Sequence, residues 1–144
     1  MKVLFLGKKS DLITDFCAEF TKNKFNNCKV ILADRNDSNT KDLLNWRGDI
    51  IISYLYPKYI PPEVLKNCNK LAINFHPGPP EYPGIGCTNY AIYNEEKTYG
   101  VTSHIISDNL NYQSKQASWD WTSGSCVFVQ NNSDDITLKP YDNL

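Results

Sequence analysis

The residues best suited to chemistry are Asn74 and His76, which lie two positions apart at the end of an apolar segment, Leu71 to Phe75. In a β-strand, side chains alternate between the two faces, so this amide and this imidazole are expected to point the same way. Open α/β sheets hold their ligands at the carboxyl ends of strands. An isolated pair of this kind is most often structural. The long Pro- and Gly-rich loop that follows, residues 77–86, favours a functional site here.

The elements that would position this pair alternate along the chain. Apolar runs predict strands, and helical spacing, caps and prolines predict helices between them. The predicted strands are Lys2–Leu6, Lys29–Ala33, Asp49–Tyr54, Lys70–Phe75 and Gly100–Ser107, and the predicted helices are Ser10–Phe20 with Ser10 as its cap, Thr40–Trp46, a segment opening at Pro61 and Cys87–Glu96. Such alternation predicts an α/β fold with a Rossmann-like, doubly wound parallel sheet.

Length and composition fit one globular domain with a core. The chain has 144 residues, 41% of them hydrophobic and 22% charged, with a net charge of -1, so no basic field draws it to nucleic acid. No apolar run is long enough to span a membrane, and the first residues lack a signal peptide's pattern. Five scattered cysteines without metal-ligand spacing indicate reduced thiols and a cytoplasmic protein with no metal site.

The pattern changes after residue 107, where polar residues become frequent. We therefore divide the chain into an α/β core, residues 1–107, and a divergent tail, residues 108–144. The tail could form a β-hairpin or be largely irregular.

The loop after the first strand, Gly7 to Ser10, excludes one common class of site. A dinucleotide site needs several glycines here, and the chain has one. Lys8 and Ser10 are candidates for contacting an anionic substrate group at the helix start, although a solvated turn explains them equally well. Tyr82, in the Pro- and Gly-rich loop, is a further candidate for substrate contact.

The loop after the third strand is aromatic and stiffened by proline. Tyr54, Tyr56, Tyr59 and Ile60 could form a wall against a flat heteroaromatic ligand. The alternative interpretation is that these amphipathic rings only cap the core.

Three motifs together resemble the folate-dependent formyltransferase family. They are Ile73-Asn74-Phe75-His76-Pro77-Gly78-Pro79-Pro80-Glu81-Tyr82-Pro83-Gly84, then Asn89-Tyr90-Ala91-Ile92, then Tyr99-Gly100-Val101-Thr102-Ser103-His104. The first motif is most similar to that of the sugar-nucleotide N-formyltransferases. The resemblance, which extends from Met1 to Ser107, implies the formyltransferase fold, 10-formyltetrahydrofolate as formyl donor and an amino sugar linked to a nucleotide as acceptor. It also implies folate binding at Tyr54–Ile60 and allows a homodimer.

The same resemblance assigns catalytic roles. It implies that Asn74 polarises the formyl carbonyl and that His76 stabilises the oxyanion and moves protons, roles that an amide donor and an imidazole can fill. The family's third catalytic residue is an Asp followed two positions later by Gly, and here these positions are Asn111 and Gln113. We therefore expect formyl transfer to be slow or absent, with an atypical or truncated C-terminal part. The alternatives are a non-catalytic remnant that binds folate or nucleotide, and an interaction module.

Overall fold

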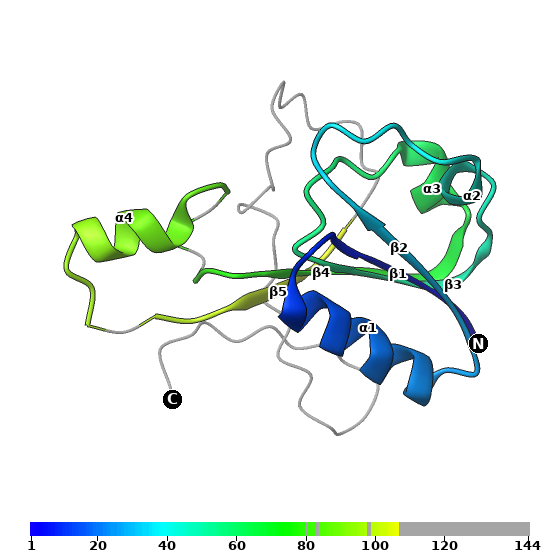
Figure 1. The fold of residues 1–144 in the computed structure, drawn as a ribbon, viewed down its shortest axis with the longest axis horizontal. Coiled ribbons are helices and arrows are strands. Elements are labelled where there is room, and N and C mark those ends of the chain that lie inside the picture. The colour runs from blue at the N-terminus through cyan, green and yellow to red at the C-terminus, as the bar shows by residue number, and fades with distance from the viewer. Residues whose placement is uncertain (80, 83, 98, 107–144) are drawn as a thin grey trace. The chain divides into compact units, whose positions relative to one another are not determined.

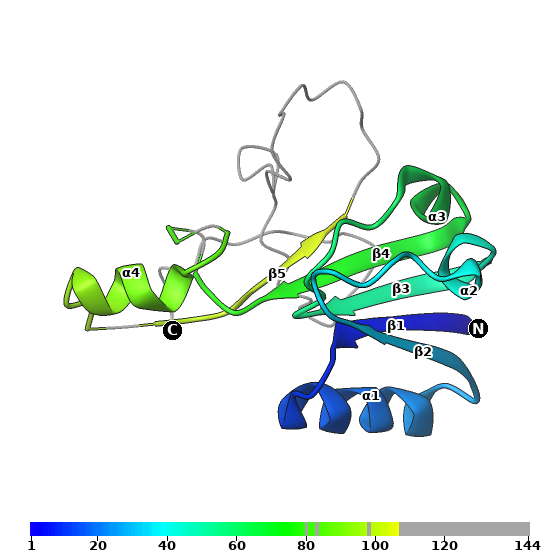
Figure 2. The same ribbon diagram turned by 45° about the horizontal axis from the view of Figure 1, so that its top comes forward.

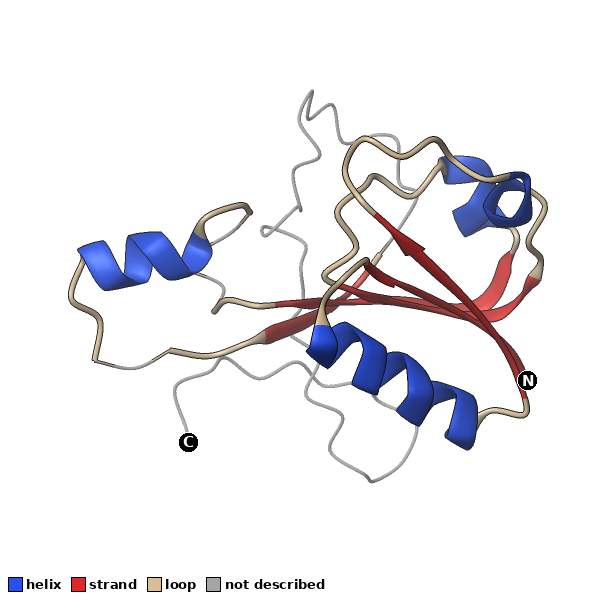
Figure 3. Cartoon of the chain, in the orientation of Figure 1, coloured by secondary structure: helices blue, strands red, loops and turns tan. Residues whose placement is uncertain are grey.

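A computed structural model describes residues 1–79, 81–82, 84–97 and 99–106. Strands and helices alternate along these residues, as Figure 3 shows in red and blue. In chain order they are β1 (Lys2–Lys8), α1 (Leu12–Lys24), β2 (Asn27–Ala33), α2 (Lys41–Leu44), β3 (Gly48–Tyr54), α3 (Pro62–Lys66), β4 (Cys68–His76), α4 (Cys87–Tyr93) and β5 (Thr102–Ile105). The tail, residues 108–144, and with it Asn111, lies outside the described residues.

The strands form one sheet in the order β2-β1-β3-β4-β5. β1 pairs in parallel with β2, from Lys2↔Asn27 to Lys8↔Ala33, and in parallel with β3, from Val3↔Ile50 to Gly7↔Tyr54. The chain therefore leaves β1 for one neighbour and returns to its other side. This is the topology of a doubly wound α/β fold, which confirms the predicted class and marks the carboxyl ends of β1 and β3 as a switch point.

The described residues separate into two compact units, residues 1–74 with Ile106, and residues 75–105. In the first unit, α1 lies on one side of the strands and α2 and α3 lie on the other (Figures 1 and 2). Its apolar core combines β1, β3 and the short helices: Leu4, Leu6, Ala33, Leu43, Trp46, Ile51, Tyr56, Ile60, Val64 and Ala72. The carboxyl ends of β1 to β3 are thus carried by a well-packed layer.

The start of α1 differs from the sequence prediction. Asp11, not Ser10, is the N-cap, because its Oδ1 accepts a hydrogen bond from the backbone N of Thr14 at 2.7 Å. Ser10 instead takes a left-handed conformation with φ of 54°. The prediction of a Ser10 cap was wrong because either residue type can cap a helix, and the turn after β1 decides which one is in place.

The apolar stripe of α1 faces away from the sheet. The small residues Thr14, Ala18 and Thr21 form its buried face. Leu12, Ile13, Phe16 and Phe20, whose spacing predicted the helix, are 86%, 59%, 70% and 55% exposed. Small residues let the helix lie close to β1, where a Cβ on Gly7 would come within 2.4 Å of the Thr14 side chain.

The second unit contains the end of β4, the Pro- and Gly-rich loop, α4 and β5. α4 ends at Tyr93 rather than at Glu96, with Asn94 as its C-cap. Across the described ranges, no helix is both long enough and apolar enough to cross a bilayer.

Candidate active site

The carboxyl end of β4 carries the two residues that the sequence singles out. Asn74 is 4% exposed and His76 is 6% exposed, whereas Phe75 between them is 39% exposed. The strand alternation predicted for this segment is therefore present. The amide and the imidazole occupy the buried side of the strand, and Phe75 occupies the other.

The imidazole of His76 is held by the loop that follows it. Its Nε2 lies 3.1 Å from the backbone oxygen of Tyr82. A carbonyl oxygen can only accept, so Nε2 is the nitrogen that carries the proton in this contact. Gly78 makes the close approach possible, since a Cβ there would lie 3.0 Å from His76 Nε2 and 2.9 Å from Cys87 Cβ.

Side chains from outside the loop fix its backbone. The hydroxyl of Thr102, at the start of β5, donates to the oxygen of Gly78 at 2.7 Å in a buried position. Tyr99 donates its phenolic hydrogen to Pro77 O at 2.7 Å, and Cys87 Sγ lies 3.4 Å from the same oxygen. Burial raises the pKa of Tyr99, which keeps this donor protonated. Sequence reasoning missed these supporting roles, although Tyr99 and Thr102 stood in the motif that signalled the family.

His104, in β5, is the other histidine of the chain. Burial lowers its pKa, and the charge of His76 lowers it further, while a contact of its Nδ1 with Ile105 O at 3.3 Å acts in the opposite sense. Among the described residues, no group of three His, Cys, Asp or Glu could hold a metal ion.

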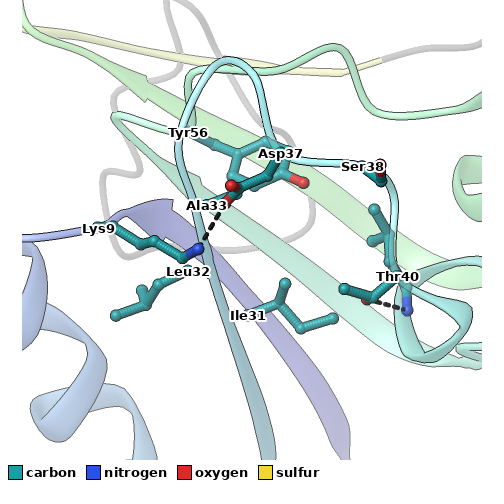
Figure 4. Close-up of a pocket in the computed structure, with 9 residues that line it drawn as sticks. Lys9, Ile31, Leu32, Ala33, Asp37, Ser38, Thr40 and Tyr56 are labelled. Carbon is teal, nitrogen blue, oxygen red and sulfur yellow. Dashed lines mark hydrogen bonds and ion pairs between the residues drawn. The ribbon is translucent and has the colours of Figure 1, made fainter.

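The first unit contains a pocket of about 240 Å³ at the carboxyl ends of β1 and β2 (Figure 4). Polar groups from the loops and an aliphatic floor line it together: Lys9, Ile31, Leu32, Ala33, Asp37, Ser38, Thr40, Leu43 and Tyr56. An apolar floor with a few convergent polar groups is the usual composition of a small-molecule site.

A charge network closes the polar side of this pocket. Lys9 Nζ lies 2.6 Å from Asp37 Oδ2, and Asp37 Oδ2 also accepts from the backbone N of Asp34 at 2.9 Å. Lys58 donates to the backbone oxygen of Asp37. The hydrogen bond with Asp37 raises the pKa of Lys9, and the same bond lowers the pKa of Asp37, so both are ionised at neutral pH. Asp37 and Lys58 gave no signal as site residues in the sequence, because single charges in loops are usually solvated.

The residues of the predicted aromatic wall lie in different surroundings. Tyr56 is 8% exposed and lines the pocket, Ile60 belongs to the core, and Tyr59 is 60% exposed. Burial raises the pKa of Tyr54, and electrostatic interactions with Cys17 and Asp11 raise it further. Leu55, which lies between Tyr54 and Tyr56, takes a left-handed conformation with φ of 52° and turns the chain there. Folate binding by all four residues remains a prediction.

The predicted substrate contacts of the first loop, Lys8 and Ser10, are both exposed. The hydrogen bond from the backbone N of Thr14 lowers the pKa of Asp11, and the charge of Lys8 lowers it to a smaller extent. Gly7 serves the packing of α1 against β1, as its contact with Thr14 shows. Tyr82, the third predicted substrate contact, is half-buried and bonds through its phenol to Glu96 and Asn94.

Comparison with known proteins defines the class. Residues 8–112 match the family described as formyl transferase. This chain therefore belongs to the formyl transferase family, as the motifs around His76 predicted.

Individual relatives fit this class. The chain is 28% identical over 114 residues to the bifunctional polymyxin resistance protein ArnA of Wigglesworthia glossinidia brevipalpis, covering 78% of this chain and 16% of that protein. It is similar to HypX of Aquifex aeolicus, solved in complex with tetrahydrofolic acid, with 28% identity and a TM-score of 0.55 over 75% of this chain and 19% of that one. The fold also matches a protein described as a likely sugar N-formyltransferase from Mycobacterium tuberculosis, Rv3404c, with 19% identity and a TM-score of 0.56 over 76% of this chain and 50% of that one. The chain thus spans half or less of the length of these relatives.

Proposed function

We propose that this chain is an N-formyltransferase that uses 10-formyltetrahydrofolate and formylates an amino sugar linked to a nucleotide. The observation that carries the proposal is the pair of buried polar side chains at the carboxyl end of β4, Asn74 and His76, in a chain of the formyl transferase family. The tetrahydrofolic acid bound to HypX supports a folate donor.

The pair suits the chemistry of formyl transfer. The acceptor amine attacks the formyl carbon, and the carbonyl oxygen becomes an oxyanion in the tetrahedral intermediate. The amide of Asn74 can donate a hydrogen bond to that oxygen, and a preorganised donor in a dry site is worth about 3 to 4 kcal/mol. His76 can stabilise the same oxygen and move a proton from the amine toward the departing folate nitrogen.

The binding roles follow from the loops beside the strands. Of the predicted folate wall, Tyr54 to Ile60, Tyr56 has the most favourable position, because it lines a pocket with an aliphatic floor. In this proposal Lys8, Ser10 and Tyr82 contact the nucleotide-linked sugar. A homodimer and a cytoplasmic location belong to the same proposal.

A second candidate is a non-catalytic member of the family that binds reduced folate or nucleotide, or serves as an interaction module. Asn111 in the position of the family's Asp favours it, because a neutral amide cannot supply the carboxylate that orients an imidazole. The double substitution Asn111→Asp with Gln113→Gly distinguishes the two. An increased rate supports an enzyme slowed at this position, and binding without transfer in both forms supports the second candidate.

The test is release of tetrahydrofolate from 10-formyltetrahydrofolate in the presence of a panel of nucleotide-linked amino sugars. We expect slow transfer that falls at least about 100-fold in Asn74→Ala, the usual loss for one oxyanion donor. His76→Ala is expected to fall similarly, whereas His104→Gln serves as the matched histidine control. Equal rates of transfer in the unmodified chain and in Asn74→Ala would show that Asn74 is not part of the active site.

A further inference from the structure

The position of His76 depends on a chain of contacts that begins at the end of α4. The backbone oxygen of Tyr82 accepts from His76 Nε2 at 3.1 Å. The phenol of the same tyrosine donates to Glu96 Oε1 at 2.5 Å and accepts from Asn94 Nδ2 at 3.0 Å. One residue therefore touches the imidazole with its backbone and the helix end with its side chain.

The helix end that holds Tyr82 is built for a fixed geometry. The backbone N of Glu96 donates to Ala91 O, and that of Glu95 donates to Ile92 O, both at 3.0 Å. These two bonds form a Schellman motif, in which the residue after the C-cap takes a left-handed conformation. Glu95 takes it with φ of 56°, although this conformation favours glycine. These backbone hydrogen bonds therefore fix the position of Glu96 beside Tyr82, even though the left-handed conformation of Glu95 is strained.

We propose that Glu96 and Asn94 are positioning residues that act through Tyr82 to select the Nε2–H tautomer of His76. With the proton on Nε2, the lone pair of the neutral ring belongs to Nδ1. The Glu96 bond raises the pKa of the Tyr82 phenol, so that phenol remains a donor across the physiological range. The tautomer is a property of the folded chain, whereas its value for proton transfer rests on the proposed function.

The contacts are direct enough to predict a measurable effect. The backbone of Tyr82 is also held by its N–H, which donates to Pro79 O at 3.0 Å. Removing the phenolic bonds therefore loosens the carbonyl without releasing the loop. A hydrogen bond contributes about 1 kcal/mol, so weakening the carbonyl contact is expected to lower the ratio of the Nε2–H to the Nδ1–H tautomer by about two- to fivefold.

Long-range ¹H–¹⁵N correlation NMR on chain labelled with ¹⁵N at histidine measures this ratio, because the two ring nitrogens of each tautomer give distinct signals. The chain has two histidines, so the spectrum of His104→Gln assigns the signals of His76. We expect the Nε2–H pattern for His76 in the unmodified chain. Tyr82→Phe and Glu96→Ala are expected to shift it toward Nδ1–H, with Glu96→Gln between them and the unmodified chain.

Glu95→Gln is the matched control, because it removes the same charge one residue away and leaves the Tyr82 contacts in place. An Nδ1–H pattern in the unmodified chain would overturn the proposal, and so would spectra of Tyr82→Phe and Glu96→Ala that match this control. Both altered side chains are at least partly exposed, so these variants are expected to fold, and Tyr82→Phe retains the ring. In the transfer assay, Glu96→Ala is expected to lower kcat two- to fivefold, whereas Glu95→Gln is expected to leave kcat unchanged. If the tautomer shifts but no variant transfers formyl groups, the proposed function fails and the positioning role stands.

Discussion

Substituting Gly78 by alanine tests how tightly the loop is packed against His76. The added methyl group would lie 2.9 Å from Cys87 Cβ, 3.2 Å from Cys87 Sγ and 3.0 Å from His76 Nε2. Carbon atoms normally meet at about 3.5 to 4.0 Å, so the loop or the start of α4 has to move. That movement also strains the buried bond from Thr102 to Gly78 O.

The magnitude follows from three terms. Overpacking costs about 1–3 kcal/mol, and weakening one buried hydrogen bond adds about 1 kcal/mol. Alanine restricts the unfolded chain, which offsets about 0.4–1 kcal/mol. We therefore expect Gly78→Ala to lower the free energy of unfolding by about 1–3 kcal/mol, measured by urea denaturation.

A double-mutant cycle with Cys87→Gly isolates the contact. Glycine at position 87 removes both cysteine atoms that the new methyl group would meet. Neighbouring substitutions that share a contact typically couple by 0.5–3 kcal/mol, and we expect at least about 1 kcal/mol here. Additive effects of the two substitutions, or a loss below about 0.5 kcal/mol in Gly78→Ala alone, would refute the packing argument.

Three further outcomes are expected. Asp11→Ala removes the N-cap of α1 and is expected to cost about 1 kcal/mol in urea denaturation, whereas Asp11→Ser retains most of it. Burial holds the pKa of folded His104 below its usual 6.5, so the unfolded chain takes up the proton at a higher pH than the folded chain does. The free energy of unfolding is therefore expected to fall as the pH drops through 6.5. His104→Gln is expected to lose this contribution to the pH dependence of stability, measured as the free energy of unfolding from about pH 8 to about pH 5. Titration calorimetry with a stable reduced-folate analogue is expected to show weaker binding in Tyr56→Ala than in Tyr59→Ala, because only Tyr56 lines the pocket; equal affinities would exclude that pocket from the folate site.

The fold and the position of the β4 pair could be predicted from local patterns. Buried strands in β1, β3 and β4 are marked by apolar runs, and the period of two in β4 separates Asn74 and His76 from Phe75. These features depend on residues that are close in sequence, so they can be predicted without the tertiary structure.

The outward face of α1 could not be predicted in the same way. Periodicity locates a helix, but the side that meets the sheet depends on the partner surface. Here the buried face of α1 consists of the small residues Thr14, Ala18 and Thr21, with Thr14 next to Gly7, and the larger Phe16 faces outward.

The supporting contacts of His76 were missed because they join residues distant in sequence. Thr102 reaches Gly78 across 24 positions, and Glu96 reaches Tyr82 across 14. Each of these residue types is common on surfaces, so type and spacing alone carry no signal. The ion pair between Lys9 and Asp37 in the pocket was not predicted for the same reason, since its partners are 28 positions apart.

The most direct test of the central claim is a single-turnover reaction with the chain in excess over 10-formyltetrahydrofolate and a mixture of nucleotide-linked amino sugars, followed by mass spectrometry of the acceptors. We expect a formylated acceptor with the unmodified chain, more of it with Asn111→Asp and Gln113→Gly combined, and none above background with His76→Ala. A formylated acceptor formed equally well by His76→Ala would show that His76 takes no part in the transfer, and the absence of product from both the unmodified chain and the double variant would show that the chain is not a formyltransferase.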